Sequence, residues 1–465
     1  MQLATKSARQ FRSFMTSQQS VGHSAAAASS GATKASFINY ENTLSQFSFP
    51  VERPSGLPFE PQLSAGVDPE TGAAVFGISF ASKFDGAGLL THAEEVPAMD
   101  VVVVMDISGS MGCAFSNDNS SQGNPWRPAP GVMSKLDVGK RAIVAISKKL
   151  RPQDRLAVLL FNHDQNVLQP LTDVDAMDTR DFKRKVEQLR PGGGTSLNAG
   201  LGAGIGLLNS ATEGAASAAG RMQRVMFLTD MQSSQLDEDE VLATIRQAAT
   251  TTSAVPVHTS LVGIGVDLSV GTVGAISATP GCRYSSVDSA EEFERSVASD
   301  FLHDVLPVAF NIKLELLAPI ADAGARRSRS CSRSSSQAAG AATMAPLQLE
   351  KSFGSAELNE TLKVGHTAAV ISSEFPSPTS PADNLLLIKP LQQQGQLQEL
   401  QVGSRCALRT TFCTLQGLEK VLEVEAQVMS TADAASEPMR SLRKALALVS
   451  FVDLQSEYCL EVRQL

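Results

Sequence analysis

The segment from 101 to 265 alternates short, almost continuously apolar runs with stretches of helical periodicity. The apolar runs are VVVVMD at 101–106, RLAVLLF at 155–161, RVMFLTD ending at Asp230 and VHTSLVGIG at 257–265. Strands of this kind are typical of parallel sheets that are buried on both faces, with helices between the strands. The alternation therefore predicts an α/β fold with a mostly parallel sheet.

The helix expected at 136–150 has the clearest amphipathic pattern. Its positive side chains Lys140, Lys148 and Lys149 avoid the apolar face. That face is formed by Leu136, Ala142, Ile143, Ile146 and Leu150. Further helices are expected near 178–189, 196–209, 237–249, 269–278 and 289–304.

Both flanks of this α/β region have β character. Residues 50–92 contain two extended apolar segments joined by the turn-like DPETG, and 306–430 contain several more, including AFNIKLELL and VLEVEAQV. Two strands are too few to bury a face, so we expect 50–92 to pair with 306–430 in one β-sandwich. A low-complexity Ser/Arg/Ala loop at 325–342 is predicted to be disordered, and an amphipathic helix is predicted at 435–465.

Composition excludes several classes of function. The formal net charge of -9 disfavours nucleic acid as a partner. The six cysteines are scattered without a CxxC pair, which argues against a zinc cluster or a disulfide framework and fits an intracellular, reducing location. No apolar run reaches the roughly 18 to 20 residues that span a bilayer, so a soluble protein is expected.

The first forty residues lack acidic side chains and combine four Lys or Arg with many Ser and Ala. This composition fits an organellar transit peptide, and it fits equally a disordered tail without a targeting role. A secretory signal is disfavoured, because no apolar region of 7 to 15 residues follows the basic residues. The segment 1–40 is thus expected to be a tail, with organellar targeting left open.

Polar side chains suited to a hard metal ion follow the expected strands. DISGSMG places Asp106 at the end of the first strand, with Ser108 and Ser110 just beyond it. Asp230 ends a second strand, and GGGTS places Thr195 on a glycine-rich loop. Ligand sites of parallel α/β sheets form at the carboxyl ends of strands, so these residues are expected at the rim of the sheet and outside its core. The simpler interpretation is that the serines cap a turn and Asp106 caps a helix.

Together these three elements resemble the von Willebrand factor type A (vWA) family, over about 96–305. The resemblance implies a doubly wound, Rossmann-like sheet and a metal-ion-dependent adhesion site (MIDAS). It also implies that Ser108, Ser110 and Thr195 bind the ion directly, while Asp106 and Asp230 act mostly through coordinated water. All five positions of the motif are filled. The flanking β segments and the last helix would then be additions to the vWA unit.

A MIDAS of this composition favours an anionic sixth ligand. Mg²⁺ requires near-octahedral oxygen coordination, and three neutral hydroxyls with two outer carboxylates leave its charge under-neutralised. We therefore expect Mg²⁺, or Mn²⁺ or Ca²⁺, to bind an Asp or Glu side chain of a protein partner. The predicted function is a metal-dependent protein-binding module of adhesion or scaffold type.

Two residues near the motif are harder to interpret. Trp126 lies in the long segment that follows Met111, where it is either a partner-binding anchor at the rim or part of a tolerated insertion. His163, in FNHDQ, belongs to no spaced ligand set and is predicted to lie on a surface loop.

Enzymatic activity of the chain itself is not expected. GGGTS lacks the lysine of a phosphate-binding loop, and DISGSMG lacks the GxSxG pattern of a hydrolase. The alternative function is a vWA subunit of a larger enzyme, of chelatase or ubiquitin-ligase type. Neither an ATPase module nor a RING cysteine array is present, so a partner would have to supply that activity.

Overall fold

A computed structural model describes most of the chain. The described residues include 56–68, 71–115, 132–212, 220–231, 235–250, 256–264, 281–287, 307–320, 343–355, 362–371, 385–391, 400–414, 418–432 and 436–464, with a few isolated positions. Several predictions lie outside them: those for the tail 1–40, Trp126, the loop 325–342, the helix near 269–278 and, except Phe301, the helix near 289–304.

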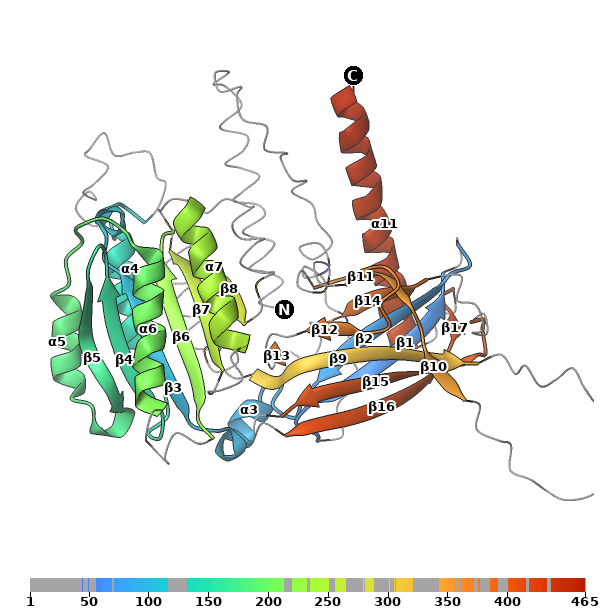
Figure 1. The fold of residues 1–465 in the computed structure, drawn as a ribbon, viewed down its shortest axis with the longest axis horizontal. Coiled ribbons are helices and arrows are strands. Elements are labelled where there is room, and N and C mark those ends of the chain that lie inside the picture. Colours follow the sequence, from blue (N-terminus) through green and yellow to red (C-terminus); the bar gives the residue numbers. More distant parts are fainter. Residues whose placement is uncertain are drawn as a thin grey trace, which may run out of the picture.

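The α/β region forms a six-stranded sheet in the order β5-β4-β3-β6-β7-β8 (Figure 1). Every neighbouring pair is parallel except β4 and β5, which form an antiparallel pair at one edge. The strands are β3 (Met99–Asp106), β4 (Arg155–Phe161), β5 (Gln165–Asp173), β6 (Met222–Thr229), β7 (Val257–Ile264) and β8 (Cys282–Val287). The mostly parallel α/β sheet expected from the sequence is confirmed.

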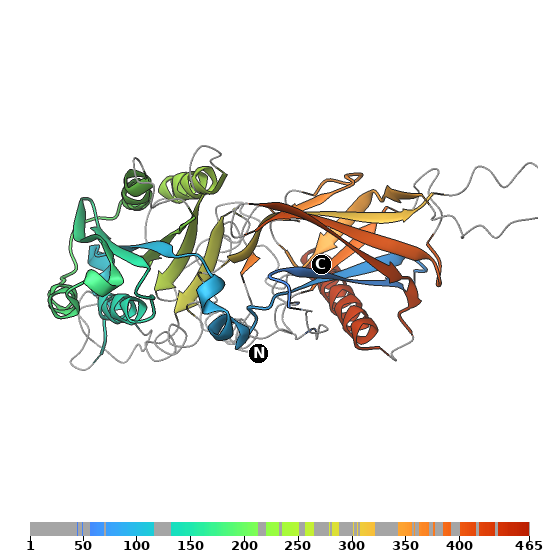
Figure 2. The ribbon, with the colours of Figure 1, turned by 90° about the horizontal axis from the view of Figure 1, so that it is seen from below.

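Helices cover both faces of this sheet, as Figure 2 shows from below. α4 (Lys135–Ser147) and α5 (Thr179–Glu187) lie on one face, and α6 (Leu197–Thr212) and α7 (Gln235–Thr250) lie on the other. Successive side chains of β3 pack against opposite helix layers. Val101 and Val103 belong to the apolar cluster that includes α4, and Val102 and Val104 belong to the cluster that includes α6. Burial on both faces explains why this strand is apolar at successive positions.

Two strands of the sheet were not anticipated from the sequence. β5 is an edge strand with largely exposed side chains, so it lacks the apolar run that identifies a buried strand. It returns antiparallel to β4 through a tight turn at 162–164. β8 pairs with the far side of β7 and is short and polar.

The β-rich flanks form two further sheets, in the orders β11-β14-β2-β1-β17 and β10-β9-β15-β16, and β9 also pairs with β12 and β13. β1 (Glu60–Val67) and β2 (Ala74–Ala81) come from before the α/β region. The later strands are β9 (Pro307–Pro319), β10 (Met344–Pro346), β11 (Leu349–Phe353), β12 (Ala369–Ile371), β13 (Phe375–Pro376), β14 (Leu386–Pro390), β15 (Arg405–Cys413), β16 (Glu419–Gln427) and β17 (Met429–Ser430). β2 pairs with β14 and β1 pairs with β17, so one sheet contains strands from both sides of the α/β region.

The C-terminal helix α11 (Glu437–Gln464) packs on the sheet that contains β1 and β2. Its buried residues Leu442 and Val449 belong to the same apolar cluster as Val75 of β2 and Leu387 of β14. None of the described helices is both long and apolar enough to cross a membrane.

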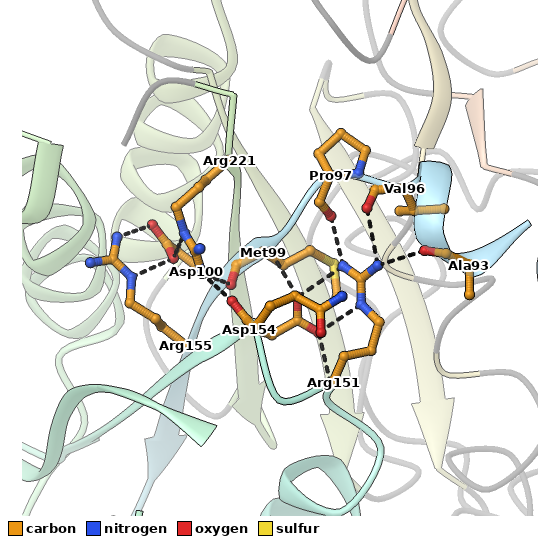
Figure 3. Close-up of polar contacts among 10 residues, drawn as sticks. Ala93, Val96, Pro97, Met99, Asp100, Arg151, Asp154, Arg155 and Arg221 are labelled. Carbon is orange, nitrogen blue, oxygen red and sulfur yellow. Dashed lines mark hydrogen bonds and ion pairs between the residues drawn. The ribbon is translucent and has the colours of Figure 1, made fainter. Parts of the chain in front are cut away.

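A short connection, α3 (Gly88–Thr91) and η1 (Ala93–Glu95), joins β2 to β3 and is held by Arg151 (Figure 3). The Arg151 guanidinium donates to the carbonyl oxygens of Ala93, Val96 and Pro97, at 3.1, 3.1 and 2.7 Å. The buried carboxylate of Asp154 accepts from the same guanidinium at 2.8 Å. Arg151 therefore fixes the connection at the amino end of the sheet.

Candidate functional site

Asp106 and Asp230 lie side by side because they follow neighbouring parallel strands. β3 and β6 pair in register, with Met105 opposite Leu228, so Asp106 at the end of β3 lies beside the end of β6. Asp230 follows directly after β6. The next residue, Met231, has a φ of 53° and is buried, so the chain turns sharply there with a non-glycine residue in the left-handed region.

The two serines connect these strand ends through their hydroxyl groups. The Oγ atoms of Ser108 and Ser110 are 3.1 Å apart, and Ser110 Oγ donates to Asp230 Oδ1 at 3.2 Å. Both serines and Asp230 are buried. Four oxygen-bearing groups, including Asp106, thus meet at the carboxyl edge of the sheet.

Asp106 is more deeply enclosed than its predicted place at the rim implies. It is 0% exposed, and its carboxylate accepts hydrogen bonds from the Ser108 N–H and the Thr229 hydroxyl, each at 2.8 Å. Burial raises the pKa of Asp106 to about 6; the hydrogen bonds from Ser108 and Thr229 lower it, and the charge of Asp230 adds to the rise. The expectation that this residue lies outside the core is therefore wrong.

The glycine-rich loop that carries Thr195 is attached to the serine loop by backbone hydrogen bonds. Gly192 N–H donates to the Ile107 carbonyl at 2.8 Å, and Gly109 N–H donates to the Gly193 carbonyl at 3.1 Å. Gly193 has a φ of +84°, and a Cβ atom there would collide with the His163 ring. Thr195, two residues later, is half-buried. The structure thus brings the loops of all five predicted residues together.

Lys135 is a member of this cluster that the sequence analysis missed. It is the first residue of α4, and its ammonium lies 3.1 Å from Asp230 Oδ2, with both side chains almost completely buried. The dipole of a helix disfavours a cation at its N-terminus, so a lysine in this position is a signal of a nearby anion. Ser134 and Asp137 form a capping box at the start of α4. Because a capping box can be recognised in the sequence, it would have placed Lys135 at the first position of the helix.

The other predictions near the site have mixed outcomes. His163 lies on an exposed turn, with 63% of its side chain accessible, beside Asp164. Among the described residues, no three His, Cys, Asp or Glu side chains gather where they could hold a metal ion. The side-chain oxygens that hydrogen bonds bring together here belong to two carboxylates and to serine and threonine hydroxyls, which suit a hard cation better than zinc.

Comparison with known proteins agrees with this geometry. Residues 101–232, which include Asp106, both serines, Thr195 and Asp230, match the family model described as von Willebrand factor type A domain. This part of the chain is a vWA domain. Domains of this family often mediate protein–protein interaction. No curated protein matches the sequence.

Several solved structures are similar to larger parts of the chain. A von Willebrand factor type A protein from Catenulispora acidiphila is 12% identical, with a TM-score of 0.45, over 83% of this chain and 77% of its own. The ArnB paralog VWA2 from Sulfolobus acidocaldarius is 9% identical, with a TM-score of 0.40, over 88% of each chain. The manganese-loaded TRAP protein of Plasmodium vivax is 21% identical, with a TM-score of 0.31, over 44% of this chain and 72% of its own.

Proposed function

We propose that the vWA domain is a metal-dependent protein-binding module. In this proposal Ser108, Ser110 and Thr195 bind Mg²⁺, or Mn²⁺ or Ca²⁺, and Asp106 and Asp230 act from the outer shell. The hydrogen bond from Ser110 Oγ to Asp230 Oδ1, at 3.2 Å, fits an outer-shell carboxylate that accepts from a ligand. The spacing of the two proposed serine ligands also supports the proposal, because Ser108 Oγ and Ser110 Oγ are 3.1 Å apart. Adjacent ligands of an octahedral Mg²⁺ are about 3.0 Å apart, given bonds of about 2.1 Å.

Thr195 supports the same assignment from a different loop. Within the part of the chain that the structure describes, its hydroxyl has no hydrogen-bond partner, whereas Ser108 and Ser110 bond each other. A half-buried hydroxyl beside this cluster retains the capacity to ligate an ion. The proposed ligand set therefore combines one uncommitted hydroxyl with two that would exchange their mutual hydrogen bond for the ion.

The charge of the site explains why its proposed ligand is acidic. The carboxylates of Asp106 and Asp230 are offset in part by the ammonium of Lys135, so a divalent ion would keep one uncompensated positive charge. Under-neutralised Mg²⁺ favours an anionic ligand. An Asp or Glu side chain of a partner protein supplies that ligand, and binding through it needs no chemical step.

The first experiment measures metal binding alone. Mn²⁺ titration of the metal-free wild-type protein, monitored by electron paramagnetic resonance, should reveal one binding site. The Thr195→Ala variant should bind Mn²⁺ at this site about 10-fold more weakly, or weaker still. Thr179→Ala, an exposed threonine at the start of α5, is the matched control and should leave the affinity unchanged. Equal affinities for all three proteins would contradict the proposed ligand set.

The second experiment asks for the partner. The immobilised protein should retain partner proteins from an extract in Mg²⁺ and release them in EDTA, and Thr195→Ala should retain less in Mg²⁺. Undiminished retention by metal-free protein would refute a metal-dependent mode of binding. Retention of an ATPase or a RING protein would favour the role of a subunit in a larger enzyme.

A further inference from the structure

α4 and α5 lie at the end of the vWA domain away from the β-sandwich (Figures 1 and 2). Residues of these two helices line a groove of about 390 Å³. Its floor contains Val144, Ala145 and Val186. The floor is part of the packing between the two helices, because Val186 is fully buried and Val144 and Ala145 are half-buried. The groove is therefore a concave apolar strip with a fixed backbone on both sides.

Positive side chains surround this strip. Lys140, Arg141, Lys148 and Lys149 come from α4 and its end, and Lys183 comes from α5. The only acidic residue of the lining, in this described region, is Glu187. A concentration of five cations is unexpected on a chain whose net charge is -9. The groove is therefore a local basic surface on an acidic protein.

Some of these positive side chains have partners within the protein, and others have none among the described residues. Lys183 pairs with Glu187 at 3.8 Å, and Lys140 lies 3.6 Å from an oxygen of Asp137 and donates to the Glu187 carbonyl at 3.5 Å. Lys148 and Lys149 are exposed, and among the described residues neither side chain has a hydrogen bond or an ion pair. Two cations at the mouth of the groove are thus available to a ligand.

The helix dipole accounts for only part of this arrangement. Lys148 is the C-cap of α4 and Lys149 follows it, and cations near a helix C-terminus are stabilised by typically 0.3 to 1 kcal/mol. That effect does not explain why Arg141 and Lys183, each in the middle of its helix, line the same groove.

We propose that this groove binds an acidic, amphipathic segment of a partner protein. Apolar side chains of the segment would lie on the half-buried Val144 and Ala145, which pack over Val186, and its carboxylates would meet Lys148 and Lys149. Helices that bind in grooves use apolar side chains at i, i+3 and i+4 as anchors, and clusters of basic residues recognise acidic motifs. The basic side chains therefore select an acidic partner segment, and the apolar floor determines the spacing of the apolar side chains along that segment.

Other anionic ligands fit this surface less well. A bilayer is flat, so its headgroups would reach the rim lysines without covering the recessed apolar floor. A nucleic-acid duplex would be repelled by the net charge of -9 beyond the groove, and its phosphates have no use for an apolar floor. The groove is also separate from the proposed metal site, because α4 carries Lys135 and Lys148 about 20 Å apart along its axis.

A phage-displayed library of random 16-residue peptides, selected on the full-length protein, tests the proposal. The selected peptides should be rich in Asp and Glu, with apolar residues three or four positions apart. Lys148→Glu together with Lys149→Glu should weaken their binding at least 10-fold, and Val144→Gln should also weaken it. The matched control is Lys363→Glu together with Lys420→Glu, two exposed lysines of the β-rich region, which changes the net charge equally and should leave binding unchanged.

Three results would overturn the proposal. They are the selection of peptides without acidic residues, undiminished binding by the Lys148→Glu/Lys149→Glu variant, and binding of vesicles with 30% phosphatidylserine in place of any peptide. Circular dichroism should confirm that each variant is folded. Peptide binding should persist in EDTA and in Thr195→Ala, so failure of the metal site and failure of the groove give different patterns.

Discussion

The ammonium of Lys135 lies 3.1 Å from Asp230 Oδ2, inside a cluster whose other charged member is the buried carboxylate of Asp106. Two buried carboxylates would repel each other strongly without a cation. In the absence of metal, Lys135 supplies that cation from the start of α4. The ion pair therefore lets the vWA domain keep its two carboxylates close together without a metal ion.

Replacing Lys135 with Met should show how much the ion pair stabilises the metal-free protein and whether Mg²⁺ can replace the lost positive charge. The metal-free variant should lose about 3 to 5 kcal/mol of stability at neutral pH, because a buried carboxylate loses its partner. Mg²⁺ should restore more stability to Lys135→Met than to the wild type, because the ion replaces the missing positive charge. Urea unfolding in EDTA and in Mg²⁺ measures both quantities, with the more exposed Lys140→Met as the control. An equal or smaller gain from Mg²⁺ in the variant would contradict this role.

Asp106 should make the stability of the metal-free protein depend on pH. The pKa of this carboxyl group is about 6 in the fold and 3.8 ordinarily. Between these two pH values the folded state therefore holds a proton that the unfolded state has lost. Stability should therefore fall as the pH rises from about 4 to 6, by up to about 3 kcal/mol. Asp106→Asn, which cannot ionise, should lack this component. A stability difference between wild type and Asp106→Asn that is the same at pH 4.5 and pH 7.5 would rule it out.

Arg151→Ala should destabilise the junction between the β-rich region and the vWA domain. The change removes three hydrogen bonds to the carbonyls of 93–97 and leaves the buried Asp154 carboxylate without its guanidinium, at a cost of about 3 to 5 kcal/mol. Arg184→Ala, which removes an exposed ion pair with Asp181, should cost less than about 1 kcal/mol. Urea unfolding compares the two, and similar losses would show that Arg151 is no more important than a surface charge.

The residues before the vWA domain should be required for folding of those after it. Expressed alone, 306–465 should be aggregated, because β14 and β17 lose their neighbours β2 and β1 and expose strand edges. Fusing 50–92 to that fragment through a Gly/Ser linker should restore a soluble protein. Gel filtration and circular dichroism test both, and a soluble, folded 306–465 on its own would show that the shared sheet is dispensable.

Much of the vWA sheet could be predicted from local pattern. The run VVVVMD and the run at 155–161 are apolar at successive positions because both faces of the sheet are covered, and that pattern is visible in the sequence alone. Because the apolar runs also show where the strands end, the sequence predicted that Asp106 and Asp230 lie at the carboxyl ends of strands. β5 escaped prediction because an exposed edge strand has no such pattern.

Only the tertiary structure decided how the candidate site is enclosed. The chain order does not show that Lys135 reaches Asp230, 95 residues away, or that Thr229 donates to Asp106. These contacts form where α4 and β6 meet the end of β3. Sequence prediction relies on local periodicity, and contacts between distant segments leave no such pattern. The grouping of β1 and β2 with β14 and β17 has the same cause, since strand partners are selected by the burial of whole faces. The sequence by itself determined which side chains could form strands, helices and oxygen ligands, and packing of the whole chain determined which of them meet.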